Sequence, residues 1–371
     1  MQKSLTCLVT GGAGFSGSWL VHELLQAGHQ VYALDREVAL GQRERRQHLS
    51  DSGFDEKNPR LTYIAADLND QHSLSVLKDQ RFDVVFHTAS LYDYSADLET
   101  LNRINVAGTE NLLRGLAGQR LSHFVHWSTC GVFGRPIASG QTANLPFSEK
   151  SSSPRNCSGD QPQGTQLVNA YSVSKWRQEQ LLWRAHRQNA LPLTVIRPAP
   201  IYGPGSDYGH GGIAMAIGNG LVPAIPEDSK NYITTSVHVQ DLARFAVHVA
   251  GRQEFIGEDY NVTDNSVISY HEFLHFLALL TGRKLFDIPF LPVPWLKPVA
   301  AFAAGVWTAL ERRWGIPRVR ILEVQSAEYI ASSYWISNRK SLSTGFQYLY
   351  PDVKEGMKDT VAWLRRTGRI T

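Results

Sequence analysis

The chain has 371 residues, 43% of them hydrophobic, which is enough for one large globular unit or two fused ones. A formal net charge of +3 without a dense Lys/Arg run argues against nucleic-acid binding. Three cysteines are too few for a disulfide framework, and we expect no metal site and a cytoplasmic location without a secretion signal.

The first predicted element is a strand that ends in a glycine-spaced turn. Residues 7–10 are apolar, Gly11, Gly14 and Gly17 follow, and apolar residues then recur at helical spacing up to Gly28. Gly11 would allow the tight turn, Gly14 the approach of backbone to a pyrophosphate, and Gly17 close packing of helix on strand. The free N–H groups of a helix beginning near Gly14 would hold the phosphates, so the turn predicts a dinucleotide cofactor.

The second predicted strand, residues 30–34, ends at Asp35. A carboxylate at this place can accept hydrogen bonds from both hydroxyls of an adenosine ribose, and its charge would repel a 2′-phosphate. This predicts NAD rather than NADP. Arg36 is the next residue and would weaken that preference if it reached the phosphate.

Strand and helix patterns continue to alternate through the first half of the chain. We predict strands at 61–66, 83–89, 123–129 and 193–197, and helices at 105–116 and 170–188. This alternation predicts an α/β fold, a Rossmann-type doubly wound parallel sheet whose ligands bind at the carboxyl ends of the strands. Gly11, Asp35, Asp67, Ala89 and Thr129 fall at those ends.

Residues after 198 break the alternation and are rich in glycine and proline. We therefore predict a cofactor-binding domain over 1–198 and a smaller, mainly substrate-binding domain over 199–371, some segments of which return to the Rossmann core. The polar stretch 140–164 is a loop that would hang near the active-site mouth or be a solvated insertion. Residues 291–310 are too short an apolar run to span a bilayer. With the Trp- and Arg-rich residues up to 320, they would cover the substrate pocket or, as the alternative, rest on a membrane surface.

Tyr171 and Lys175 lie one turn apart on the predicted helix 170–188. A tyrosine with a pKa near 10 is a poor proton shuttle at neutral pH, but a nearby ammonium group would lower that pKa. Ser128 and Thr129, at the end of the strand 123–129, would supply a hydroxyl that orients a substrate oxygen. Combined with the glycine turn and Asp35, these residues predict a redox enzyme.

At this point the chain resembles the extended short-chain dehydrogenase/reductase superfamily over nearly its whole length. The matching pieces are Thr10 to Gly17, Asp67-Leu68, His87-Thr88-Ala89, Asn105 to Thr109, Ser128 to Gly134, Tyr171 to Lys175, Arg197-Pro198 and Val237 to Ala243. The resemblance implies that Thr129, with Ser128 beside it, holds the catalytic Ser/Thr position. It also implies cofactor contacts at Phe15, Ser16, Asp67, Leu68, Thr88, Ala89, Ser90, Asn105 and Pro198, besides the glycines, Asp35, Arg36, Tyr171 and Lys175. Ser16 departs from the aliphatic residue usual in the superfamily.

Other positions bear on the branch of the superfamily. Dehydratases carry an acidic pair where this chain has Cys130 and Gly131, which makes dehydration improbable. Sugar-nucleotide enzymes generally have an asparagine at the position of Pro200 and an arginine at that of Thr234; both would bind a diphosphate. The segments 87–89, 197–203 and 334–337 resemble the 3β-hydroxysteroid dehydrogenase branch.

The resemblance thus implies an NAD-dependent oxidoreductase acting on a secondary alcohol or ketone of a largely apolar small molecule. Tyr171 would be the acid/base, and Tyr92, Thr129, Ile201 and Tyr202 would contact the substrate. The alternative is a sugar-nucleotide epimerase that uses the same Thr, Tyr and Lys. A non-catalytic dinucleotide sensor would not need those three residues. A homodimer is expected only by analogy with the superfamily.

Overall fold

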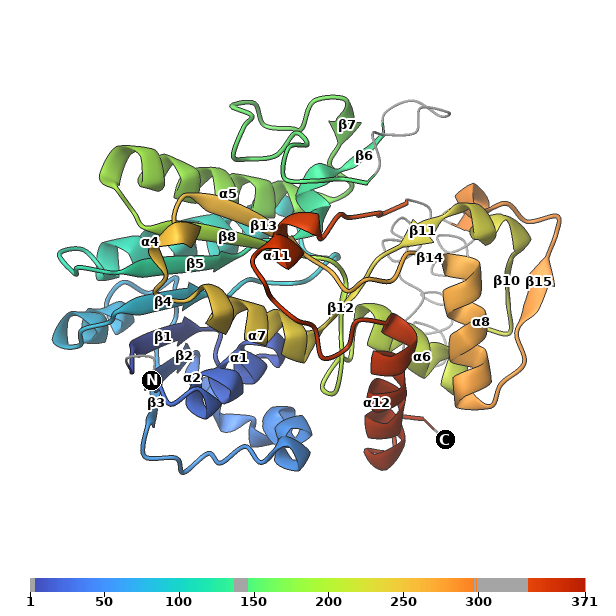
Figure 1. Ribbon diagram of the computed structural model, residues 1–371, viewed down its shortest axis with the longest axis horizontal. Helices are drawn as coiled ribbons and strands as arrows, with labels where there is room; N and C mark the ends of the chain where they lie inside the picture. Colours follow the sequence, from blue (N-terminus) through green and yellow to red (C-terminus); the bar gives the residue numbers. More distant parts are fainter. Residues whose placement is uncertain (1–3, 137–145, 297, 299–332, 371) are drawn as a thin grey trace, which may run out of the picture.

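A computed structural model describes residues 4–136, 146–296, 298 and 333–370, and a seven-stranded parallel sheet forms the middle layer of one half of the molecule (Figure 1). The strand order is β13-β8-β5-β4-β1-β2-β3. The strands are β1 (Thr6–Thr10), β2 (Gln30–Asp35), β3 (Leu61–Ala65), β4 (Val84–His87), β5 (His123–Trp127), β8 (Leu193–Pro198) and β13 (Glu258–Val262). Since β1 pairs with both β2 and β4, the chain order reverses beside β1, which makes this the switch point of the sheet. The predicted Rossmann-type fold is confirmed.

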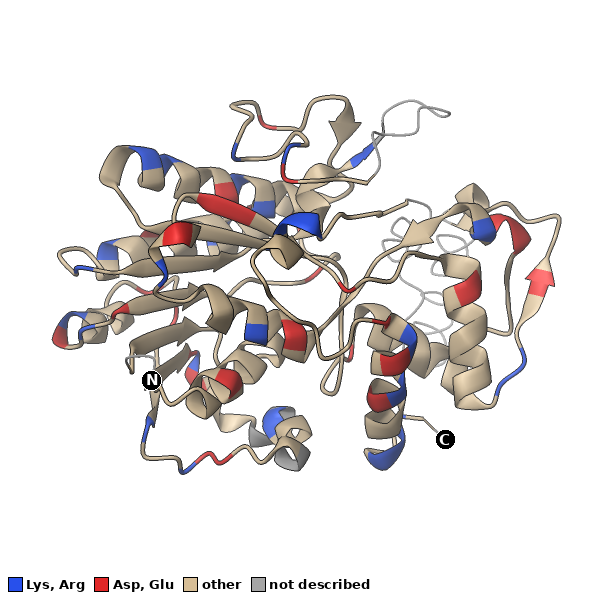
Figure 2. Ribbon diagram, in the orientation of Figure 1, with Lys and Arg blue, Asp and Glu red and all other residues tan. Residues whose placement is uncertain are grey.

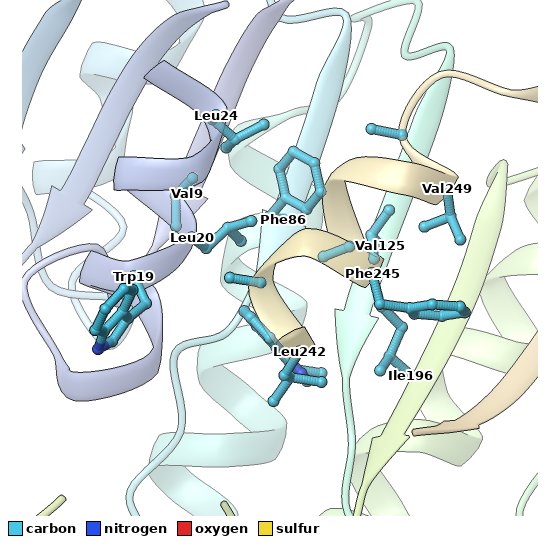
Figure 3. Close-up of a cluster of buried hydrophobic side chains, with 14 of the residues drawn as sticks. Val9, Trp19, Leu20, Leu24, Phe86, Val125, Ile196, Leu242, Phe245 and Val249 are labelled. Atoms are coloured by element: carbon cyan, nitrogen blue, oxygen red, sulfur yellow. The ribbon is translucent and has the colours of Figure 1, made fainter. Parts of the chain in front are cut away.

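Helices cover both faces of the sheet, which is why its central strands are almost wholly buried and mostly apolar. On one face α1 (Phe15–Gln26) and α7 (Val239–Val249) pack side by side over alternate strand residues (Figure 3). The labelled residues of this cluster are Val9, Trp19, Leu20, Leu24, Phe86, Val125, Ile196, Leu242, Phe245 and Val249. On the other face α4 (Gly108–Gly115) and α5 (Ala170–Asn189) cover the intervening residues, such as Leu8 and Val85.

The helix predicted at 105–116 begins earlier than expected. The helical run consists of α3 (Leu98–Leu101), a π-helical segment η3 (Asn102–Ala107) and α4, and the Asp97 carboxylate caps its start by accepting from the Thr100 N–H at 2.7 Å. The helix predicted at 170–188 matches α5, whose N-cap Asn169 accepts from the Ser172 N–H at 2.8 Å.

The second half of the chain adds segments to the Rossmann core and also builds a smaller lobe beside it. The strand β13 extends the sheet beside β8, and α7 covers one of its faces, so two segments after residue 198 return to the Rossmann core. The rest builds a smaller lobe with its own core around Phe273, Leu277 and Met357. Its elements include β9 (Ile201–Tyr202), α6 (Gly209–Gly218), β10 (Ala224–Pro226), β11 (Ile233–Thr234), β12 (Val237–His238), β14 (Ile268–Ser269), α8 (Tyr270–Thr281), β15 (Phe286–Ile288) and α12 (Val353–Arg366). The short helix α11 (Arg339–Ser343) packs instead against β13.

Shorter elements complete the described chain. They are α2 (Glu37–Gly41), η1 (Arg43–Ser52), η2 (Ser73–Asp79), η4 (Cys130–Phe133), β6 (Arg135–Pro136), β7 (Thr165–Gln166), η5 (Glu227–Asn231), η6 (Gln253–Phe255) and η7 (Val293–Trp295).

The two stretches singled out after residue 139 are described only in part. Of the predicted loop 140–164, the structure describes 146–164, where Phe147 bridges to Ile336 and Arg155 binds Asp259. Of the segment 291–320, residues 297 and 299–320 lie outside the described residues. Among the helices that the structure does describe, none combines the length and the apolarity needed to cross a membrane.

Candidate active site

The glycine turn lies between β1 and α1 and requires two of its glycines for packing. Gly11 has φ +72°, and a Cβ there would lie 2.9 Å from the Ala89 Cα; a Cβ on Gly17 would lie 2.0 Å from the Gly11 carbonyl oxygen. A Cβ on Gly14 would meet only that same oxygen, at 3.2 Å. Gly14 is also the N-cap of α1 and provides no side-chain cap, so the first N–H groups of the helix are available to an anion. These features fit the pyrophosphate of a dinucleotide.

Asp35, the last residue of β2, is held across from this turn. Its Oδ2 accepts from the Ala13 N–H at 3.0 Å, and its Oδ1 accepts from the Arg36 N–H at 2.9 Å. A carboxylate oxygen can accept more than one hydrogen bond, so both oxygens keep capacity for ribose hydroxyls. The Arg36 side chain is exposed.

Lys175 is fully buried on α5 and donates to three neutral acceptors. Its Nζ lies 2.9 Å from Ser90 Oγ, 2.8 Å from the Trp127 carbonyl oxygen and 2.6 Å from Gln178 Oε1. Burial lowers the pKa of Lys175 to about 7, against the opposing effect of the Glu179 carboxylate one helical turn away. The ammonium group is therefore poised to titrate near neutral pH.

A buried hydrogen-bond chain extends from Lys175 to β1. Gln178 Nε2 donates to Thr109 Oγ1 at 2.8 Å, and His87 lies between Thr109 and Thr10 with 2.8 Å contacts to both hydroxyls. Burial lowers the pKa of His87 to about 3, so the imidazole is neutral. Gln178 is not among the site residues predicted from the sequence, although its spacing of three from Lys175 on one helix could have indicated it.

Tyr171 packs within a group of four tyrosines that we call the tyrosine cluster: Tyr92, Tyr94, Tyr171 and Tyr208. Its ring meets those of Tyr92 and Tyr94 edge-on, with centroids 5.1 and 5.6 Å apart, and Tyr92 donates to the Tyr94 hydroxyl at 2.9 Å. Tyr92 and Tyr208 are exposed, whereas Tyr171 is 7% exposed. The structure thus brings Tyr92, a predicted substrate contact, beside Tyr171, together with Tyr94 and Tyr208.

The two hydroxyl residues after β5 have different partners. Ser128 Oγ is buried and donates to Glu179 Oε2 at 2.6 Å. Thr129 is partly exposed, and its Oγ1 accepts from the Gly131 N–H at 3.1 Å. Because the Ser128 hydroxyl is engaged inside the protein, Thr129 is the better placed of the two to meet a substrate oxygen.

Glu179 belongs to a buried ionic network that the sequence did not indicate. Arg197 on β8 binds Glu179 and also Asp259 on β13, and all three side chains are fully buried. Arg155 and Lys340 complete the network by binding Asp259 and Glu258. Figure 2 shows the acidic start of β13 beside the basic α11. The network ties the loop 146–164 and the C-terminal region to the helix that carries Tyr171 and Lys175.

Asn105 joins the turn after β4 to the same helix. Its Oδ1 accepts from the Leu91 N–H at 2.7 Å, and its Nδ2 donates to Ser174 Oγ at 3.0 Å. Thr88 Oγ1 donates to the Thr10 carbonyl oxygen at 2.7 Å. The backbone around Ala89 and Ser90 is therefore held by the Thr88 hydrogen bond before it and by the Asn105 hydrogen bond after it.

The other residues predicted to contact the cofactor or the substrate lie at several places in the fold, and not all of them fit their predicted roles. Asp67 and Leu68 follow β3, Pro198 ends β8, and Phe15 and Ser16 begin α1. Ile201 is partly buried against the sheet-side core. Tyr202 does not fit its predicted role: its ring is fully buried in the core of the smaller lobe, 5.3 Å from the His238 ring and against Gly356 of α12. Tyr202 therefore packs inside this core, and its predicted contact with the substrate is not supported.

The fold and this site define an extended short-chain dehydrogenase/reductase. The chain belongs to the NAD dependent epimerase/dehydratase family, whose model matches residues 7–263.

Named relatives lie at low identity. The chain is 27% identical to sterol-4-alpha-carboxylate 3-dehydrogenase, decarboxylating, of Bos taurus over 307 residues, which covers 80% of this chain and 75% of that protein. It is 24% identical to a 3 beta-hydroxysteroid dehydrogenase/Delta 5-->4-isomerase of Mycobacterium tuberculosis over 364 residues, covering 92% and 86%. A solved UDP-glucose 4-epimerase of Thermus thermophilus, in complex with NAD, superposes with a TM-score of 0.67 at 21% identity, covering 97% of this chain and 99% of that one.

Proposed function

We propose that the protein interconverts a secondary alcohol and a ketone on a largely apolar small molecule, with NAD as the redox partner. The observation that carries this proposal is the tyrosine cluster, which places the aromatic rings of Tyr92 and Tyr94 edge-on against the candidate acid/base Tyr171. The names of the two curated relatives, a sterol and a steroid dehydrogenase, support the same substrate class.

The roles of the residues follow from their chemistry. NAD, when bound, accepts or supplies the hydride at its nicotinamide ring. Tyr171 would take the proton from the substrate hydroxyl or return it to the ketone oxygen. Lys175 in its charged form would favour the phenolate form of Tyr171 over the neutral phenol. Thr129 would hold the substrate oxygen by a hydrogen bond.

The positions that distinguish sugar-nucleotide enzymes also support an apolar substrate. Pro200 has no side-chain donor, and Thr234 is buried in β11 and carries no charge. Neither residue can make the charge-assisted contact that an arginine makes with a diphosphate. We therefore expect weak binding of UDP and UDP-sugars.

A substrate screen tests this proposal. We expect steroid-like or other apolar secondary alcohols to produce net NADH absorbance, with affinity rising along a homologous series, because each buried CH₂ contributes about 0.8 kcal/mol. The matched control is Tyr171→Phe, which removes only the hydroxyl and should lower turnover by about 10²–10⁴-fold while NAD still binds. Tight UDP-sugar binding without a net NADH signal would instead establish an epimerase.

Cofactor preference gives a second prediction. We expect NAD to bind several-fold more tightly than NADP, because Asp35 accepts from the ribose hydroxyls and repels a 2′-phosphate. Asp35→Ala should weaken NAD binding by about tenfold or more, since hydrogen bonds to charged groups contribute about 1.5–3 kcal/mol. Calorimetric titration with both cofactors measures the change, and an unaltered ratio of the two affinities in the variant would remove Asp35 from this role.

A further inference from the structure

Two histidines and an aspartate converge on the smaller lobe, outside the candidate active site. His271 and His275 are four residues apart on one face of α8, and Asp287 lies on β15. The Nε2 atoms of the two histidines lie 3.0 and 2.8 Å from the same oxygen, Asp287 Oδ1. The three candidate donor atoms all lie within 4.8 Å of one another.

This arrangement matches the donor set of a transition-metal site. Histidine pairs four residues apart on a helix present both rings to one point, and the ring centroids here are 4.4 Å apart. In a tetrahedral zinc site the metal–nitrogen and metal–oxygen bonds are about 2.0–2.2 Å, which places neighbouring donor atoms roughly 3.3 Å apart. The observed histidine–carboxylate separations need to widen by only a few tenths of an ångström to admit such an ion.

Access and charge also suit a cation. The side chains of His271, His275 and Asp287 are 28, 34 and 40% exposed, so an ion can enter and water can complete its coordination. Lys230 lies near enough to sense the Asp287 charge, but its ammonium group is paired with Glu227 at 2.9 Å. Two imidazoles and one carboxylate favour Zn²⁺ or a similar ion over Mg²⁺ and Ca²⁺, which prefer oxygen ligands.

We propose that His271, His275 and Asp287 bind a divalent transition-metal ion of the Zn²⁺ class and thereby clamp β15 to α8. The strand β15 pairs with β10 over three residues, so a metal bridge would add a strong tie between this short ribbon and the helix. The sequence alone predicts no metal site. The histidine spacing is visible in the sequence, but the third ligand comes from a different element and its position follows only from the fold. The proposal does not depend on the proposed redox function.

Zinc titration of the full chain, freed of any affinity tag and treated with a chelator, tests the site. We expect one Zn²⁺ to bind per chain by calorimetry, Co²⁺ to give the visible absorption of a nitrogen- and oxygen-coordinated ion, and Mg²⁺ to give neither signal. Zn²⁺ should also raise the Tm of the wild-type protein.

Substitutions of the three residues test whether each of them is a ligand of the metal ion. His271→Ala, His275→Ala and Asp287→Asn should each weaken Zn²⁺ binding by at least the roughly 10–100-fold that even an outer-shell partner contributes. The control His72→Ala changes an exposed histidine on another part of the chain and should bind as the wild type does. Asp287→Asn keeps the size of the side chain, so it remains informative if an alanine variant is unstable. Failure of the wild type to bind Zn²⁺, or equal binding by all variants, would overturn the proposal and leave a hydrogen-bonded triad.

Discussion

Lys175 donates hydrogen bonds to three neutral oxygen acceptors, and the Glu179 carboxylate, one helical turn along α5, opposes the lowering of its pKa by burial. Ser90, Trp127 and Gln178 satisfy its three donors without neutralising it. Three hydrogen bonds thus fix the position of the Lys175 ammonium group without pairing it with a carboxylate. This arrangement supports the role proposed for Lys175, which is to stabilise the phenolate of Tyr171.

The burial of Lys175 predicts a pH-dependent stability in the cofactor-free protein. Its pKa is about 7 when folded and about 10.4 when unfolded. Between these values the unfolded chain binds a proton that the folded protein does not, so the destabilising effect of burying the charge is relieved as the pH rises. Relative to Lys175→Met, the wild type should gain up to about 1.4 kcal/mol of stability per pH unit in this window.

Urea unfolding of both proteins at several pH values from neutral to alkaline measures this difference. Parallel stability curves would contradict the lowered pKa of Lys175.

Some site residues could be predicted from the sequence, and others could not. Tyr171 and Lys175 are one helical turn apart, so local periodicity brings them together. The inward orientation of Ser128 depends on Glu179 and Arg197, which come from two other elements. Likewise, Tyr208 reaches the tyrosine cluster from the beginning of the smaller lobe, a contact that only tertiary structure creates.

At the scale of elements, two glycines of the turn between β1 and α1 are expected to serve different purposes: Gly17 allows close packing, and Gly14 allows the cofactor to approach the backbone. Gly17→Ala would place a Cβ against the Gly11 carbonyl oxygen, a backbone atom that cannot yield easily, and should cost about 1–3 kcal/mol of folding stability. Gly14→Ala places its Cβ 3.2 Å from the same oxygen, a milder contact, so it should cost less stability than Gly17→Ala but lower NAD affinity by about tenfold. Thermal unfolding and NAD titration distinguish the two effects.

Gly41→Ala is the matched control for both variants, because a Cβ there meets nothing within 4 Å. A Gly14→Ala protein that binds NAD like the wild type would show that backbone approach at this position is not required.

The strands of the first half follow their apolar patterns closely, whereas β13 does not look like a core strand. Its sequence begins Glu258-Asp259, and a buried parallel strand normally reads as an apolar run. In the folded protein these carboxylates are neutralised by Arg155, Arg197 and Lys340, which lie far from them in the chain. The sequence pattern does not identify β13, because the basic residues that compensate its buried carboxylates come from other elements and meet them only in the folded protein.

At the scale of the whole molecule, the predicted boundary at residue 198 has a testable consequence. A fragment of residues 1–198 lacks β13 and α7, so β8 loses one neighbour and Leu20 and Phe86 lose part of their packing. We expect this fragment to lack a cooperative unfolding transition and to bind a hydrophobic dye.

A longer fragment, 1–265, restores both segments and serves as the control. It should show a more cooperative transition by circular dichroism. Cooperative folding of the shorter fragment would show that residues 1–198 form an independent domain.

The late position of β13 in the chain also matters while the protein is being made. After Pro198 leaves the ribosome, about 60 more residues must follow before the partner of β8 is available, which takes roughly 3–12 s at typical elongation rates. During this interval the nascent chain presents an open, apolar sheet edge, which invites pairing with other chains. Chaperones that bind such an edge on the nascent chain should therefore raise the yield of the native protein, even if the finished protein is stable.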